Sequence, residues 1–275
     1  MELHPYRRGA ERAPPVPPSP ADLGAPKRTH TTSRRLLVQR LVVASVTCLV
    51  LAAFAASLGL AEADGGAPSA GAVAILTAIV VAIFALLAAP LVRMVGLRVR
   101  VHEDGIVVER GRARDAVAFE DVDAVYFELA MHSALGGEIA LVSAVRLVER
   151  AGGVHRVPIT VEDGIDVLRV ILRRCTDPLA PDARAAIAAG EPLHFGDVTI
   201  DRDGISVAGA RARWSELALV RMQPGRVALC RASKLWPWRT VRLDKVPHPT
   251  LFTALVTSLA SKVEQDDPAT KLLGG

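Results

Sequence analysis

The sequence predicts a two-helix transmembrane hairpin followed by an α+β, mainly antiparallel β soluble region of two similar units, each closed by a C-terminal helix. Three observations lead to this fold class. Two uncharged apolar stretches occupy residues 41–60 and 72–92. From residue 97 onward, hydrophobic and polar residues alternate with the period of β-strands. The order of turns and strands that begins at Asp104-Gly105 then recurs from Asp203-Gly204.

The amino-terminal tail, residues 1–33, is rich in proline and poor in large apolar side chains. Such a composition buries too little surface to offset the entropy of an ordered chain, so we expect a disordered cytoplasmic tail. Pro15 and Pro18 have the PxxP spacing of segments that dock into aromatic grooves. A plain solvated linker is the alternative interpretation.

Each apolar stretch is long enough to cross a hydrocarbon core of about 30 Å at roughly 1.5 Å per helical residue. The segment between them, residues 61–71, is so short that it predicts an antiparallel hairpin with an external loop. Residues 1–40 hold eight Lys or Arg and the loop holds none. The positive-inside rule then predicts a multi-pass protein with both termini in the cytoplasm. The bias toward Ala, Arg and Val and the lack of another targeting signal favour a bacterial inner membrane. A cleaved signal peptide is disfavoured, because the region before the first stretch is too long.

The β region divides into a first unit at 97–176, a linker at 177–191 and a second unit at 192–262, followed by a disordered tail at 263–275. The two Asp-Gly pairs predict hairpin turns that use the positive φ of glycine. In the linker, Pro181 and Gly190 bracket a short helix. A single intertwined β-rich domain remains the alternative to two units.

The repeat resembles the pleckstrin-homology-like (PH-like) superfold, in which a strand meander is closed by a C-terminal helix. The motifs that carry it are Asp104-Gly105-Ile106 to Phe119-Glu120-Asp121-Val122 and Asp203-Gly204-Ile205 to Trp214-Ser215-Glu216-Leu217. Together with Ala189-Gly190-Glu191-Pro192, Phe195-Gly196 and Val246-Pro247, they resemble an uncharacterised family of bacterial membrane proteins with PH-like soluble repeats. The resemblance implies a fold and carries no catalytic residue.

No pattern typical of catalysis, cofactor binding or metal binding is present. Cys48, Cys175 and Cys230 lack metal-site spacing, and we expect all three to be buried. The histidines do not pair with carboxylates at helical spacing, so we expect them on strand surfaces or in loops; they are His4, His30, His102, His132, His155, His194 and His248. The sequence therefore predicts no catalytic residue, no cofactor and no metal, and a protein that is not an enzyme.

One basic segment is a candidate binding site. Residues 211–242 hold eight Lys or Arg against one acid, Glu216, and include Trp236 and Trp238 close to Lys234 and Arg239. Basic side chains and Trp both favour an anionic bilayer surface. The candidate lipid-contact residues are Arg231, Lys234, Trp236, Trp238 and Arg239. An exposed basic strand pair with one buried Trp is the competing structural interpretation.

These features predict a membrane-anchored, non-enzymatic PH-like binding or scaffold protein. An anionic-lipid-sensing module that uses the basic 211–242 hairpin is the alternative, and an enzyme is a distant one. The expected partners are the lipid bilayer and either a protein or a second copy of the chain. Nucleic acid is not expected, because residues 93–275 hold 25 Lys or Arg against 24 Asp or Glu and are nearly neutral.

Overall fold

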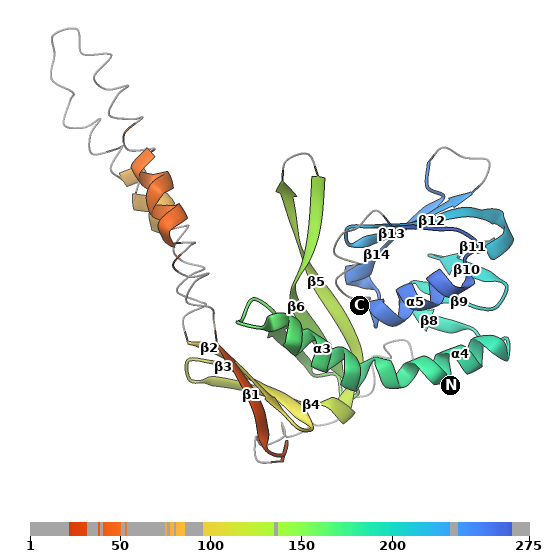
Figure 1. Cartoon of the computed structure of the whole chain (residues 1–275), viewed down its shortest axis with the longest axis horizontal. Coiled ribbons are helices and arrows are strands. Elements are labelled where there is room, and N and C mark those ends of the chain that lie inside the picture. The colour runs from red at the N-terminus through yellow and green to blue at the C-terminus, as the bar shows by residue number, and fades with distance from the viewer. Residues whose placement is uncertain are drawn as a thin grey trace, which may run out of the picture.

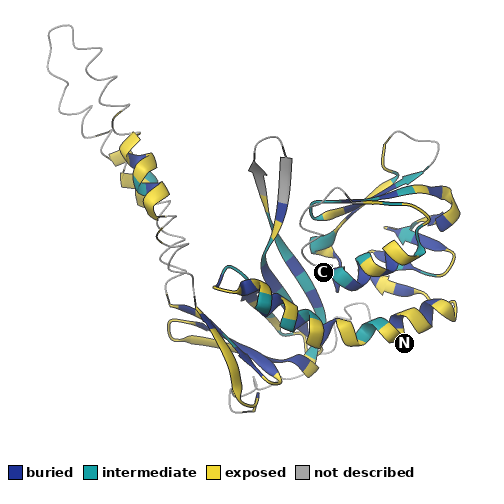
Figure 2. Cartoon of the chain, in the orientation of Figure 1, coloured by how far each residue is buried: buried dark blue, intermediate teal, exposed yellow. Residues whose placement is uncertain are grey.

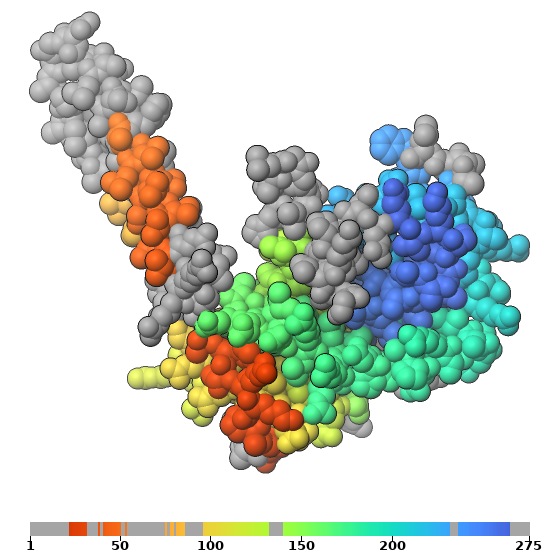
Figure 3. Space-filling model, viewed as in Figure 1, coloured from red at the N-terminus to blue at the C-terminus, as the bar shows by residue number. Residues whose placement is uncertain are grey.

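The computed structural model describes residues 22–31, 38, 41–50, 53, 75, 78–79, 81–85, 96–134, 137–231 and 236–265. These residues form mainly antiparallel β-sheets with few helices. Figure 1 shows two β-rich units beside one another, with the helical residues 41–50 standing away from both. In the space-filling view, residues 41–50 also stand apart from the coloured residues of both units (Figure 3).

The predicted transmembrane hairpin is contradicted by the structure. No helix among the residues described is long and apolar enough to cross a membrane. The two spans at 41–60 and 72–92, the multi-pass topology and the inner-membrane location are corrected accordingly. The loop predicted at 61–71 lies outside the described residues.

The first unit consists of two antiparallel sheets and a helix. Its four-stranded sheet has the order β1-β2-β3-β4, formed by β1 (Pro26–Thr31), β2 (Leu97–His102), β3 (Gly105–Arg110) and β4 (Ala113–Ala118). After the 3-10 turn η1 (Phe119–Asp121), the second sheet has the order β5-β6-β7, formed by β5 (Val122–Ala134), β6 (Gly137–Glu149) and β7 (Val154–Pro158). The amphipathic helix α3 (Gly164–Cys175) closes the unit and buries Val167, Leu168 and Ile171 against the sheets.

Strand β1 corrects the prediction of disorder across residues 1–33. It pairs antiparallel with β2, from Pro26 opposite His102 to Thr31 opposite Arg98. Its sequence is polar and has little strand propensity, so its order comes from the tertiary partner that supplies the ladder. His30 is 6% exposed and its Nδ1 lies 3.0 Å from the carbonyl of Glu162. Residues 1–21 and 32–33 lie outside the described residues.

The second unit repeats this order. Its first sheet, β11-β10-β9-β8, is formed by β8 (Leu193–Phe195), β9 (Val198–Ile200), β10 (Gly204–Val207) and β11 (Ala210–Arg213). After η3 (Trp214–Glu216), β12 (Leu217–Gln223), β13 (Arg226–Arg231) and β14 (Arg239–Arg242) form the next sheet, and η4 (Leu243–Lys245) leads into the helix α5 (Pro249–Leu259). Strand β15 (Val263–Gln265) then adds parallel to β12, which corrects the predicted disorder at 263–265. Residues 266–275 lie outside the described residues.

The sequence repeat is a structural repeat at the level of single hydrogen bonds. Phe119 N donates to Asp104 O at 2.8 Å, and Trp214 N donates to Asp203 O at 3.0 Å. The prediction that Gly105 and Gly204 adopt a positive φ in their hairpin turns is wrong, because neither residue has a positive φ. Each begins a strand at a close backbone approach: a Cβ on Gly105 would lie 2.4 Å from Val117 O, and one on Gly204 would lie 2.2 Å from Ala212 O.

The buried hydrophobic residues form two main core clusters, one in each unit. One core lies between residues 97 and 175 and the other between residues 183 and 256. Figure 2 shows buried positions concentrated inside each unit. The linker forms η2 (Asp177–Leu179) and the helix α4 (Ala180–Ala188), as expected from Pro181 and Gly190. Through Ala183, Ala186 and Ile187, α4 belongs to the core of the second unit.

His248 joins the units: it lies in the loop between η4 and α5, as predicted, but it is buried. It is 3% exposed and precedes α5 with φ 46°. Its backbone N donates to Val125 O of β5 at 2.7 Å. Because a carbonyl only accepts, Nε2–H donates to Asp123 O at 3.0 Å, and in the neutral ring Nδ1 accepts from the Thr176 hydroxyl at 3.1 Å. The ring thus connects β5, the end of α3 and the start of α5.

Candidate functional site

The basic segment singled out in the sequence is centred on the antiparallel pair β13 and β14, where Leu229 lies opposite Arg239. Trp238 N donates to Leu229 O at 2.7 Å, which fixes the ring at the start of β14. Of the predicted lipid-contact residues, the structure brings Arg231, Trp238 and Arg239 together. Lys234 lies outside the described residues.

Two arginines stack on Trp238. The guanidinium carbon of Arg231 lies 4.6 Å from the ring centroid, and that of Arg239 lies 5.7 Å from it. Both distances are within the range of cation–π attraction. Trp238 is half-buried and packs against the core of the second unit. The stack therefore secures the strand pair and leaves little of the Trp238 ring for a ligand.

Trp236 is different, because its side chain is 81% exposed. A Trp side chain that is left in water forgoes the free energy of burying its large apolar surface. Arg239, three residues along the chain, is also exposed. The loop before β14 therefore presents an unburied aromatic ring three residues before an exposed arginine, and Arg231, Trp238 and Arg239 hold the base of the strand pair.

Acidic side chains, most of them outside the segment in the sequence, pair with several of its bases. At least four of the bases that the structure describes in this segment form ion pairs: Arg211 with Asp201 at 2.7 Å, Arg221 with Glu264 at 3.1 Å, Arg231 with Glu216 at 3.1 Å and Arg242 with Asp244 at 2.6 Å. Only Glu216 of these four acids lies within residues 211–242. The sequence window therefore overstates the positive charge that the folded surface presents.

Two of these acids have shifted pKa values. Burial would raise the pKa of Asp201, but hydrogen bonds from Arg211 and from the backbone N–H groups of Asp203 and Gly204 outweigh burial and lower it. The hydrogen bond from Arg242 lowers the pKa of Asp244. Asp201 Oδ1 accepts both backbone N–H groups at 2.9 Å. Both carboxylates are therefore charged structural partners at neutral pH.

A second polar cluster escaped the sequence analysis. His155 Nδ1 lies 2.5 Å from Asp115 Oδ1, and His155 Nε2 lies 3.2 Å from Glu149 Oε1. The three residues come from β7, β4 and β6, so the cluster bridges the two sheets of the first unit. Within the described ranges, no group of three or more His, Cys, Asp or Glu side chains is placed to hold a metal ion. No local spacing in the sequence would have revealed this cluster, because register between strands creates it.

The cysteines are not arranged for chemistry. Burial in the last turn of α3 raises the pKa of the Cys175 thiol to about 12, so the nucleophilic thiolate is scarce at neutral pH. Cys48 is also buried, as predicted. Cys230 is only half-buried, which corrects the expectation that all three are core residues.

The comparisons with known proteins indicate a family without indicating an activity. No curated protein matches the chain. A family model described as a family of unknown function, DUF6585, matches residues 19–265. This match includes strand β1, both β units and strand β15. The chain therefore belongs to the DUF6585 family.

Proposed function

We propose that this protein is a non-enzymatic binding or scaffold protein, built from two PH-like units, that engages a protein partner through Trp236 and Arg239. The observation that carries the proposal is the 81% exposure of Trp236 at the tip of a strand pair that is otherwise well fixed. Trp and Arg are the residue types most enriched among those that dominate protein–protein binding energy.

The arrangement of each unit supports the PH-like part of the proposal. A four-stranded meander, a 3-10 turn, three further antiparallel strands and a C-terminal helix follow in the same order twice. This is the order that the PH-like resemblance implies. Because one fold hosts many functions, the binding role rests on the exposed side chains rather than on the fold.

The charges favour a protein partner over an anionic lipid surface. A lipid surface attracts a protein through several unpaired cations, each contributing about 1 kcal/mol. Here Arg211, Arg221, Arg231 and Arg242 already have carboxylate partners. A protein partner with an apolar pocket for Trp236 and an acidic rim for Arg239 can bind without several unpaired cations on this surface.

Binding to anionic lipid is the second candidate, since Trp prefers the membrane–water interface. Vesicle co-sedimentation separates it from the first. The full chain is mixed with phosphatidylcholine vesicles with and without phosphatidylserine, at low and high salt. If binding requires phosphatidylserine and weakens with salt, the ligand of this site is an anionic lipid surface rather than a protein.

The test of the first candidate compares three forms of the full chain in quantitative affinity purification: wild type, Trp236→Ala with Arg239→Glu, and Val154→Ala. Val154 is 54% exposed at the corresponding turn of the first unit and is the matched control. We expect a protein that the double variant loses and the control retains, and whose purified form binds the wild-type chain directly. Equal recovery by all three forms would overturn the proposal.

A further inference from the structure

A groove between α4 and α5 offers a second possible binding site, lined by residues other than those around Trp236. It has a volume of about 410 Å³. That volume falls within the range of about 300–1,000 Å³ typical of small-molecule pockets. The helices that form it come from the linker and from the end of the second unit.

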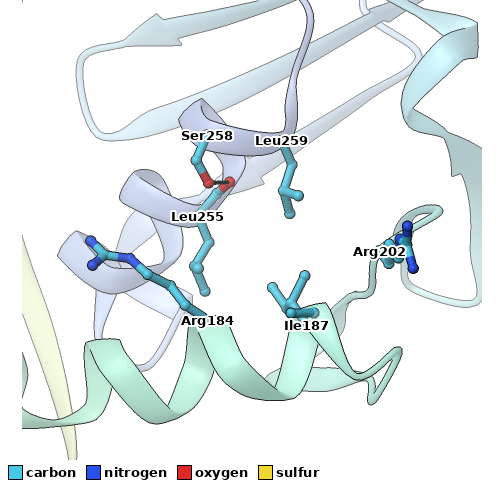
Figure 4. A pocket seen from close by; sticks show the side chains of 7 residues that line it. Arg184, Ile187, Arg202, Leu255, Ser258 and Leu259 are labelled. Carbon is cyan, nitrogen blue, oxygen red and sulfur yellow. Dashed lines mark hydrogen bonds between the residues drawn. The ribbon is translucent and has the colours of Figure 1, made fainter.

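The floor of the groove is apolar. Ile187 of α4 and Leu255 and Leu259 of α5 point toward one another across the gap (Figure 4). Ile187 and Leu255 are 6% and 3% exposed and belong to the hydrophobic core of the second unit. The floor is therefore fixed by core packing and exists without a ligand.

Two arginines lie on opposite sides of this floor. Figure 4 shows Arg184, on α4, on one side of the apolar side chains and Arg202, from the β9–β10 turn, on the other. Both are exposed, and among the residues that the structure describes neither side chain has a hydrogen-bond or ion-pair partner. No acidic residue lines the groove. The Ser258 hydroxyl donates to Leu255 O at 2.8 Å, so its oxygen is left as an acceptor.

We propose that this groove binds a small amphipathic dianion, with a linear hydrocarbon body on the floor and an anionic group facing each arginine. The apolar floor recognises the hydrocarbon, and the two guanidiniums, which are donors only, favour an anionic acceptor at each end. A protein surface fits less well, since a stable interface uses about 20–30 residues a side and this groove has seven lining residues.

The experiment is isothermal titration calorimetry of the full chain with three probes of equal chain length: dodecanedioate, laurate and 1,12-dodecanediol. We expect dodecanedioate to bind with one-to-one stoichiometry. Laurate lacks one carboxylate and should bind about three- to tenfold more weakly, because a charge-assisted pair at a partly exposed site contributes modestly. The neutral diol should bind more weakly than laurate.

Three variants locate the site. Arg184→Gln and Arg202→Gln should each weaken dodecanedioate binding by about three- to tenfold. Ala188→Trp fills the groove from an exposed position, so it should abolish binding while leaving the core intact. Arg173→Gln, at an exposed position on α3, is the charge-matched control and should change nothing. Thermal unfolding followed by circular dichroism checks that each variant is folded.

Several results would overturn the inference. They are the absence of saturable dodecanedioate binding, equal binding of dodecanedioate and the diol, and binding that persists in all three groove variants. A synthetic peptide with two glutamates flanking two leucines provides the remaining comparison. If the peptide binds the groove and dodecanedioate does not, the occupant is a protein segment rather than a small dianion. The Trp236 variants leave this site intact, so the two proposals fail independently.

Discussion

The two β units share a framework and differ in how the edge of one strand is covered. Val125 of β5 and Val220 of β12 occupy equivalent places, because each lies three residues after the first residue of its strand. Val125 O accepts from the backbone N of His248, so the second unit covers the edge of β5. Val220 N donates to Lys262 O, and β15 covers the edge of β12. An uncovered edge strand invites pairing with other chains.

The units also differ in what their second sheets present. The hairpin of the first unit is long, with strands β5 and β6 of 13 residues each, whereas β12 and β13 have 7 and 6. A Cβ on Gly225, in the β12–β13 turn, would lie 2.7 Å from Leu129 Cδ1 of β5, so this short hairpin rests against the long one. The first unit thus supports the second, and the second carries Trp236.

The largest expected effect tests the shared framework. Gly204→Ala should lower the free energy of unfolding of the second unit by about 3 kcal/mol, because its Cβ would meet the carbonyl of Ala212 at 2.2 Å and backbone gives way little. All three Trp residues lie in the second unit, so Trp fluorescence in urea follows that unit alone. Gly209→Ala, with φ +80° and open space, should cost only about 1 kcal/mol.

Gly105→Ala is the same test in the first unit. Its Cβ would lie 2.4 Å from Val117 O. It should shift the circular dichroism transition more than the Trp fluorescence transition. A Trp transition that moves as far as in Gly204→Ala would show that the two units unfold as one.

The next effect concerns the junction. His248→Asn keeps a residue that tolerates the positive φ but removes the ring that reaches Asp123 and Thr176. Leaving these buried groups unpaired should cost about 2 kcal/mol. We expect the circular dichroism and Trp fluorescence midpoints in urea to separate. Coincident midpoints, unchanged from wild type, would show that His248 does not couple the units.

A smaller effect distinguishes the turns between paired strands. Asp201→Ala removes the acceptor of two backbone N–H groups and of Arg211 and should cost the second unit about 1–2 kcal/mol, read from Trp fluorescence. Asp104→Ala, at an exposed position in the corresponding turn of the first unit, should stay within about 0.5 kcal/mol. Equal losses would mean that the Asp201 contacts contribute nothing of their own.

The smallest effect is a pH dependence. Burial lowers the pKa of His248 from 6.5, although the carbonyl and the charge of Asp123 act to raise it. The unfolded chain therefore binds the proton first. The stability from the neutral ring is fully present above pH 6.5 and is lost as the pH falls through the lowered pKa. The loss is about 1.4 kcal/mol for each unit by which the pKa of the folded chain lies below that of the unfolded chain.

Urea midpoints measured from pH 8 to pH 5 check this prediction. Wild type should lose stability toward low pH by more than His248→Asn does. His194→Gln, at an exposed position, is the control and should follow wild type. A wild-type profile that matches that of His248→Asn would contradict the assignment.

Local patterns predicted much of the β framework. Leu97, Val99 and Val101 alternate with polar residues and are buried in β2, and the recurrence from Gly105 to Gly204 marks a true structural repeat. These features succeed because the periodicity of a strand is set over a few residues.

The features that were missed depend on distant partners. Strand β1 is polar and is ordered by β2, and β15 is ordered by β12. The basic segment looked unpaired because Asp201 and Glu264 lie outside it in the sequence. His248 likewise gave no local indication of a junction. The membrane hairpin was inferred from hydropathy alone, and the helices described do not support it.

The most direct test of a binding role in the second unit is site-specific photocrosslinking in the source cells. Benzoylphenylalanine replaces Trp236 in one form of the full chain and Val154 in another, so that corresponding turns of the two units are compared. Our account predicts a discrete crosslinked protein from position 236, which Arg239→Glu weakens, and none from position 154. Identical crosslinks from both positions, or none from position 236 in chain shown to be folded, would contradict it.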